Sequence, residues 1–228
     1  YRVFLGTSTN YNYENAIFVR SLGKNPLTSA LYKETAKKKT SSKRVALVFD
    51  AYDNADGLAK VISVMKKYKV TGDFFINGEF IRRYPKETVQ IAKSGYECGS
   101  MFFTALDLTS KDFVVDEDFV RRGLARNEDE FFQTTGKELS LLWHAPFYKA
   151  DSEVKKAGKN CGYSYVEAGR FSLDTITLEE AARGKPGYLS ALELVSFYAQ
   201  NLVDGSVIPV STGLSKGTRS DWLYEKLD

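Results

Sequence analysis

The chain has 228 residues, enough for one α/β domain that buries about 70% of the surface its unfolded chain would expose. Its 32 basic and 29 acidic residues give a net charge of +3, and no basic stripe alternates with aromatic residues, so nucleic acid is not an expected partner. No apolar run approaches the roughly 20 residues of a membrane-spanning helix, and two cysteines, Cys98 and Cys161, predict buried free thiols rather than a disulfide framework.

Residues 1–43 differ in character from the rest of the chain. They are polar and aromatic and lead into the basic tract KETAKKKTSSKR, which is typical of a solvated connector. We therefore predict an N-terminal segment and linker over residues 1–43 and one domain over residues 44–228. The chain opens without the basic and apolar regions of a signal peptide and stops within an amphipathic stretch, so we expect it to be part of a longer polypeptide.

From Val45 onward, strand-like and helix-like stretches alternate. Runs of β-branched and aromatic residues predict strands over residues 45–49, 72–77, 96–103, 139–146, 163–169 and 205–211. Apolar residues at helical spacing predict helices between them, over residues 58–65, 86–95, 116–132, 152–162 and 188–202. Short connections between alternating elements favour parallel strands covered by helices. We predict an α/β fold, a distorted or incomplete (β/α) barrel.

Polar and aromatic residues follow the predicted strands. In a (β/α) barrel the chemistry takes place at the C-terminal ends of the strands, where the loops gather. The residues at these ends are Asp50–Asp53, Asn77, Ser100–Phe103, His144–Tyr148, Glu167–Arg170 and Ser211–Thr212.

Two motifs, GDFFINGEFIRRYP at residues 72–85 and SGYECGS at residues 94–100, lie in register with VALVFDAYDN at residues 45–54. Together they resemble the NodB-homology polysaccharide deacetylases of carbohydrate esterase family 4, whose motifs are T-F-D-D-G, A-T-F-F-x-x-G and G-H-E-I-G-N-H-T-x-x-H. The resemblance is strong from Arg44 to Thr109 and weaker to Thr212. It implies a barrel that removes acetyl groups from glycans with one divalent metal held by an Asp and two His. It also favours an extracytoplasmic or cell-envelope location.

The three metal ligands of the family are missing from this chain. The resemblance places the catalytic base at Asp50 but the three ligands at Ala51, Met101 and Ala105, and a late family histidine at Ser211. Independently, the chain contains a single histidine, so it cannot supply two imidazoles to one site. We therefore expect no metal cofactor. A relocated site remains an alternative, with candidate ligands Asp50, Asp53, Glu97, Cys98 and His144.

Asp50 and His144 are the candidate catalytic residues. Asp50 could bind a sugar hydroxyl, or it could cap a helix beginning near Asn54. His144 stands where the family places an arginine that pairs with the base, so we hypothesise an Asp50–His144 pair. The alternative is a satisfied core histidine.

Aromatic residues gather at two strand ends. The candidate binding residues are Trp143, Phe147, Tyr148 and Phe102, whose rings could stack on a pyranose. They could instead plug a cavity that no longer holds metal and water, and Met101 supports the plug because methionine fills irregular gaps.

These observations predict a polysaccharide-deacetylase-like domain without the family metal site, a catalytically inactive pseudoenzyme that binds glycan or cell-wall polysaccharide or has a structural role. The alternative is a divergent hydrolase of amide bonds that uses a relocated metal or the Asp50–His144 pair. A third possibility is a protein-interaction module that uses the aromatic stretch TNYNYENAIF at residues 9–18.

Overall fold

The computed structural model describes residues 44–184, 187–215 and 219–228. The predicted N-terminal segment, residues 1–43, lies outside the described residues, and so does the stretch TNYNYENAIF. Among the described residues, no helix is both long enough and apolar enough to cross a bilayer.

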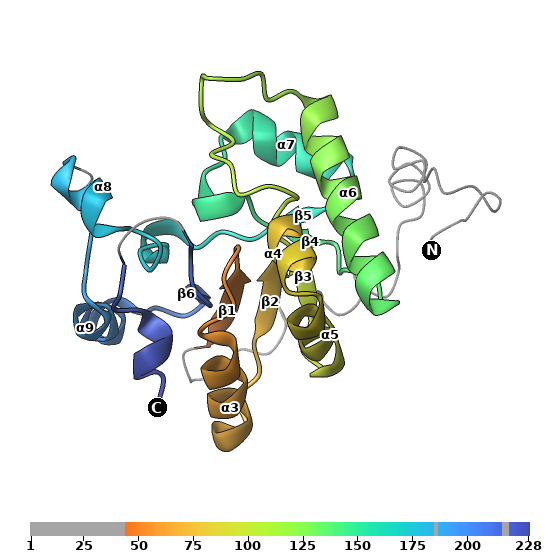
Figure 1. Cartoon of the computed structure of the whole chain (residues 1–228). Coiled ribbons are helices and arrows are strands. Elements are labelled where there is room, and N and C mark those ends of the chain that lie inside the picture. Colours follow the sequence, from red (N-terminus) through yellow and green to blue (C-terminus); the bar gives the residue numbers. More distant parts are fainter. Residues whose placement is uncertain (1–43, 185–186, 216–218) are drawn as a thin grey trace.

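The centre of the fold is a parallel sheet of six strands in the order β5-β4-β3-β2-β1-β6 (Figure 1). The strands are β1 (Val45–Ala51), β2 (Asp73–Ile76), β3 (Cys98–Ser100), β4 (Leu142–Trp143), β5 (Ser164–Tyr165) and β6 (Ser206–Ser211). Every pairing is parallel, and the described residues contain no strand that joins β5 to β6. The sheet is therefore an open, curled half-barrel, which confirms the predicted fold class.

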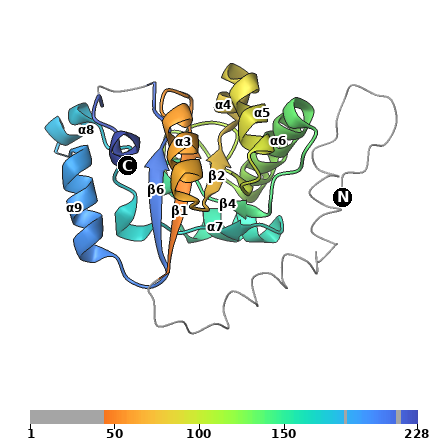
Figure 2. The same ribbon diagram turned by 90° about the horizontal axis from the view of Figure 1, so that it is seen from below.

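Helices alternate with the strands along the chain and cover the sheet (Figure 2). They are α3 (Leu58–Tyr68), α4 (Gly78–Arg83), α5 (Pro85–Lys93), α6 (Glu117–Thr135), α7 (Ser152–Asn160), α8 (Leu178–Ala182) and α9 (Ala191–Asn201). Short 3₁₀ turns in the described part of the chain are Pro146–Tyr148, Gly169–Phe171 and Leu223–Lys226. The strand predicted over residues 139–146 shrinks to two residues in β4, and Pro146, which has no N–H for a ladder, begins the turn that follows.

Local sequence signals explain where the longest helix begins and ends. Asp116 is the N-cap of α6, and its side chain accepts a hydrogen bond from the Phe119 N–H. Gly136 ends the helix with a left-handed φ of 70°, which a glycine adopts without steric cost. Helix α6 can therefore span the flank of the half-barrel and pack on α4, α5 and α7.

Alternation along β1 separates two layers of the core. Phe49 and Ala51 belong to the large cluster under the helices, whereas Val48 and Tyr52 belong to a smaller cluster inside the half-barrel. Because side chains of a strand alternate between its faces, Asp50 shares the inner face with Val48. The last carboxylate of β1 therefore points into the mouth of the half-barrel.

Candidate functional site

The site lies where β1 and β4 end. Asp50 is paired in register with Phe75 of β2 and Ser211 of β6, so it is fixed from both sides. His144 follows β4, and its N–H donates to the Ser100 carbonyl at 3.1 Å. The Asp50 side chain is 1% exposed and the His144 side chain 0%. Both groups are thus held rigidly and removed from bulk water.

Asp50 and His144 are in direct contact. Nε2 of His144 lies 3.2 Å from Oδ1 of Asp50, and Nδ1 lies 2.9 Å from the Ala145 carbonyl oxygen. A carbonyl can only accept, so the Ala145 contact suits a hydrogen on Nδ1, and the Asp50 contact suits one on Nε2. The imidazole is thus held between two acceptors.

Tyr148 closes over this pair. Its ring stacks on the His144 imidazole with centroids 4.0 Å apart and planes 8° apart, and its hydroxyl donates to Asp50 Oδ1 at 3.4 Å. Burial, and then the Asp50 charge, raise the pKa of Tyr148 well above its usual value. The hydroxyl therefore keeps its proton and remains a donor. Asp50 Oδ1 has two neighbours that direct hydrogens toward it.

A second aromatic pair extends the cover. Tyr52 and Phe147 stack with centroids 5.1 Å apart, and the Phe147 N–H donates to the Tyr52 hydroxyl oxygen at 3.2 Å. Phe147 and Tyr148 have φ angles of 58° and 57°, in the left-handed region that costs a non-glycine residue about 1–2 kcal/mol. The packing of these rings must offset that cost. We call Tyr52, Phe147 and Tyr148 the aromatic cover.

The residues at the positions of the family metal ligands offer no suitable donor. Ala51 is 0% exposed and has only a methyl side chain, and Met101 is 0% exposed and has a thioether. Ala105 also has only a methyl side chain, and its backbone N–H donates to Glu79 Oε1 at 3.3 Å. Among the described residues, no three His, Cys, Asp or Glu side chains converge as a metal-binding group. The donor set does not fit the divalent metal that the family resemblance implies.

The candidates for a relocated metal site do not come together either. Asp53 is occupied, because Arg83 Nη1 contacts its Oδ2 at 3.3 Å and the Ser215 N–H donates to its Oδ1 at 2.8 Å. Cys98 begins β3 and so lies at the opposite end of that strand from the site, with Glu97 just before it. Burial raises the pKa of the Cys98 thiol to about 12, so it stays protonated at neutral pH. Asp50 and His144 are the two members of the set that meet.

The sequence profile of the family described as "Polysaccharide deacetylase" matches residues 37–166, more than half of the chain. The chain belongs to the polysaccharide deacetylase family. It is 33% identical to the peptidoglycan-N-acetylmuramic acid deacetylase PdaA of Bacillus subtilis (strain 168) over 130 residues. The aligned stretch covers 56% of this chain and 47% of that relative. The chain thus spans about half the length of that curated relative.

Solved structures of the same family share the fold. The peptidoglycan N-acetylglucosamine deacetylase Bc1960 superposes with a TM-score of 0.64 at 21% identity, over 82% of this chain and 79% of that one. A CE4-family pseudoenzyme from Bacillus anthracis superposes with a TM-score of 0.60 at 15% identity, over 75% and 56% of the two chains. At these identities the likeness establishes the polysaccharide deacetylase fold and nothing about the reaction.

Within this polysaccharide deacetylase fold, the predicted aromatic residues are unequally placed. Trp143 is 0% exposed and Phe102 1%, so neither ring reaches the surface, whereas Phe147 and Tyr148 are half-buried. The Trp143 ring packs edge-on against Tyr165 at 5.2 Å. Sugar stacking by these residues remains a prediction.

One alternative for Asp50 is wrong. Helix α3 begins at Leu58 rather than near Asn54, its N-cap is Gly57, and no side chain caps it. Asp50 lies in β1 and faces His144 and Tyr148 instead. The carboxylate is part of a polar network between strand ends and caps no helix.

Asp174 is a site residue that the sequence analysis missed. Its carboxylate accepts from the Ser211 and Leu223 N–H groups at 2.8 and 3.1 Å and lies 3.7 Å from Arg219 Nη2. Burial raises the pKa of Asp174 to about 6, although Arg219 and the two N–H groups act to lower it, and the Asp50 charge adds to the rise. Asp174 lies between short irregular turns, where no periodic pattern indicates its position.

Proposed function

We propose that this domain is a catalytically silent polysaccharide deacetylase-like domain, retained to bind glycan or to support neighbouring domains. The observation that supports the proposal most strongly is the donor set at the barrel mouth. Ala51, Met101 and Ala105 stand at the positions that the family resemblance assigns to the metal ligands. Without a cation, nothing lowers the pKa of water from 15.7 toward about 7, so hydroxide is not available at neutral pH.

The contacts and the burial of the Asp50 carboxylate support the same proposal. A general base needs a free lone pair within reach of the water that it deprotonates. Oδ1 of Asp50 faces His144 Nε2 and the Tyr148 hydroxyl, and the carboxylate is 1% exposed. Within the aromatic cover, Tyr148 stacks on His144 and its hydroxyl contacts Oδ1 itself.

An acetate-release assay tests the proposal. The full chain is incubated with acetylated chito-oligosaccharide and with Zn²⁺, Co²⁺ or Mg²⁺ in turn, and free acetate is measured over time. We expect no release above the protein-free control. Sustained turnover that disappears in Asp50→Ala would refute the silent-domain proposal.

A second candidate function is a divergent amide hydrolase that works without a metal. The contact of 3.2 Å between His144 Nε2 and Asp50 Oδ1 favours it, because a carboxylate that orients an imidazole is a recurrent acid–base arrangement. This function requires the aromatic cover to open. It predicts turnover that survives chelation by EDTA and is lost in His144→Gln, whereas a relocated metal site predicts turnover that EDTA abolishes.

A further inference from the structure

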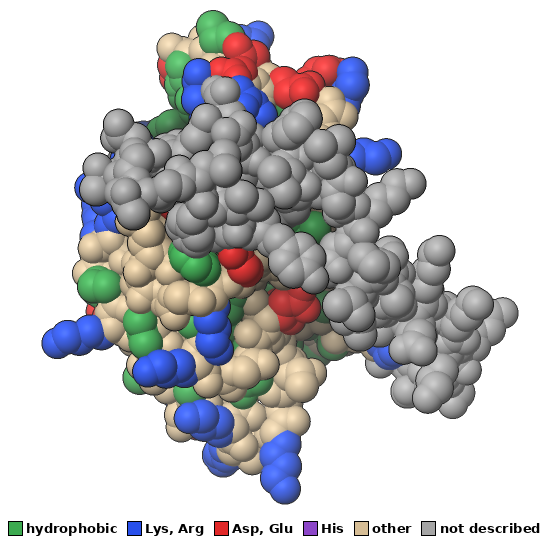
Figure 3. All heavy atoms as spheres, turned by 90° about the vertical axis from the view of Figure 1, so that its right-hand side faces the viewer, with side chains coloured by type: hydrophobic (Ala, Val, Ile, Leu, Met, Phe, Trp, Pro, Cys, Tyr) green, Lys and Arg blue, Asp and Glu red, His purple; other side chains and the backbone are tan. Residues whose placement is uncertain are grey.

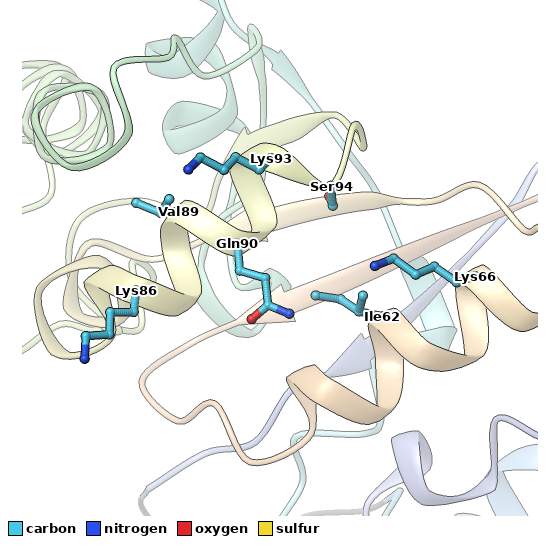
Figure 4. Close-up of a pocket in the computed structure, with 7 residues that line it drawn as sticks. All are labelled: Ile62, Lys66, Lys86, Val89, Gln90, Lys93 and Ser94. Carbon is cyan, nitrogen blue, oxygen red and sulfur yellow. The ribbon is translucent and has the colours of Figure 1, made fainter.

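The closed strand ends raise the question of where else this domain could hold a ligand. Helices α3 and α5 lie side by side outside the sheet, and between them is a hollow of about 390 Å³ (Figure 4). Its lining consists of Ile62 and Lys66 from α3 and Lys86, Val89, Gln90, Lys93 and Ser94 from α5 or its end. We call this the α3–α5 groove.

The walls of the groove are basic. In Figure 4, Lys66 extends from α3 toward α5, and Gln90 extends from α5 toward Ile62. Lys86, Gln90 and Lys93 recur at i, i+4 and i+7, so they share one face of α5. Lys86 and Lys93 point outward at the rim. The groove therefore presents cations from both helices around one amide.

These lysines lack the ion pairs that some other cations of the domain form. Lys60 forms an ion pair with Asp228 at 2.7 Å and Lys155 with Glu167 at 2.6 Å. Lys66, Lys86 and Lys93 form no ion pair with any carboxylate among residues 44–184, 187–215 and 219–228. Lysines in the last turn of a helix also stabilise it through the helix dipole, but Lys86 is in the first turn of α5, where a cation is unfavourable.

Basic side chains also outnumber acidic ones on the two helices of the groove, where α5 carries Glu87 beside Lys86. On the side of the molecule shown in Figure 3, the lower part carries Lys and Arg side chains with no acidic side chain among them. Helices α3 and α5 lie at that level in Figure 1. An excess of positive charge at a hollowed surface attracts an anionic ligand.

We propose that the α3–α5 groove binds an acidic polysaccharide. Ile62 is 4% exposed and Val89 half-buried, so little apolar surface is available to a lipid tail or to the apolar face of a helix. Exposed ammonium groups match the carboxylates of an acidic sugar polymer, and the Gln90 amide can donate to and accept from its hydroxyls. The proposal extends the glycan-binding part of the proposed function, but it does not depend on whether the strand-end site is catalytic.

Binding of polygalacturonic acid oligomers to the full chain tests this proposal by titration calorimetry at low and at physiological salt. Lys66→Glu/Lys93→Glu is the groove variant, and Lys111→Glu/Lys159→Glu is the matched control. All four lysines are exposed, both variants change the net charge equally, and Lys159, like Lys66 and Lys93, is in the last turn of its helix. Thermal unfolding establishes that both variants are folded.

We expect the groove variant to bind polygalacturonate roughly tenfold more weakly than wild type, and the control variant to change less than about twofold. Binding should weaken with salt. Equal losses in both variants would overturn the proposal, because they would indicate a non-specific effect of net charge. Absence of wild-type binding, equal binding of neutral dextran, or a preference for phosphatidylglycerol vesicles would also overturn it. Acetate release is measured separately, so failure here leaves the proposed function standing.

Discussion

Replacing Asp50 with alanine tests whether this buried carboxylate stabilises the fold. The alternative is that it is a catalytic remnant that lowers the stability of the fold. Asp50→Ala leaves His144 Nε2 and the Tyr148 hydroxyl facing a small void without their acceptor. A hydrogen bond to a charged group is worth about 1.5–3 kcal/mol, and the Tyr148 contact at 3.4 Å belongs at or below the weak end of that range. Breaking a buried pair from one side costs about 3–5 kcal/mol. We expect a loss of about 3 kcal/mol in the free energy of unfolding.

Urea unfolding, followed by tryptophan fluorescence, measures this loss as a shift of the midpoint. The m-value should be the same in the variant and in wild type. For a domain of this size, about 3 kcal/mol corresponds to a fall of roughly 6–12 °C in Tm. Asp50→Asn keeps an acceptor oxygen and the side-chain volume, so it should lose about half as much. Asp56→Ala, at an exposed carboxylate in the following loop, is the control and should change stability by less than about 0.5 kcal/mol.

A double-mutant cycle identifies the partners. Tyr148→Phe removes the hydroxyl but keeps the ring that stacks on His144. We expect Asp50→Ala and Tyr148→Phe to couple by about 0.5–1 kcal/mol, because the two side chains are in contact. An Asp50→Ala protein that is as stable as wild type, or more stable, would refute the reasoning. That result would mean that the carboxylate is kept against the stability of the fold, as functional groups often are.

Three further predictions concern groups around or outside this network. The buried Asp174, with a pKa raised to about 6, keeps its proton in the folded state up to about pH 6, whereas the unfolded chain releases it near pH 4. The contribution of this group to stability therefore falls as pH rises from about 4 to 6. The difference in unfolding free energy between wild type and Asp174→Asn should change by at most about 3 kcal/mol over that range. A difference independent of pH would contradict this prediction. Lys69 is exposed at the C-cap of α3 with φ 54°, so Lys69→Gly should raise the free energy of unfolding by about 1 kcal/mol. A lower Tm in this variant would show that the lysine side chain stabilises the helix end. Because His144 is the single histidine, its reaction with diethyl pyrocarbonate reports access to the site, and Tyr148→Ala should speed it roughly tenfold or more; equal rates would show that the aromatic cover does not close the site.

Much of the fold follows from local sequence patterns. The β-branched run at β1 and the apolar spacing in α3 predict those elements within a few residues, and Asp116 and Gly136 mark the ends of α6. Helix α4 was not predicted, because its six residues, Gly78–Arg83, are too few for a helical period to appear.

The candidate site was predictable in part. Parallel strands bring their C-terminal ends together, so the proximity of Asp50 and His144 could be anticipated from their places after two strands. The left-handed backbone of Phe147 and Tyr148 could not, because aromatic residues seldom adopt it and only tertiary packing holds them there. Asp174 could not either, because it comes from an irregular segment that long-range contacts bring under β6.

The metal content of the untagged full chain, after dialysis against Zn²⁺, Co²⁺ or Mg²⁺, shows whether the domain has kept a metal site. Elemental analysis and titration calorimetry give the stoichiometry, and Ala51→Asp/Met101→His/Ala105→His serves as the variant with the family ligand types restored. We predict no stoichiometric metal in the wild-type chain. One ion per wild-type chain, bound in the micromolar range or tighter and lost in Asp50→Ala, would contradict it.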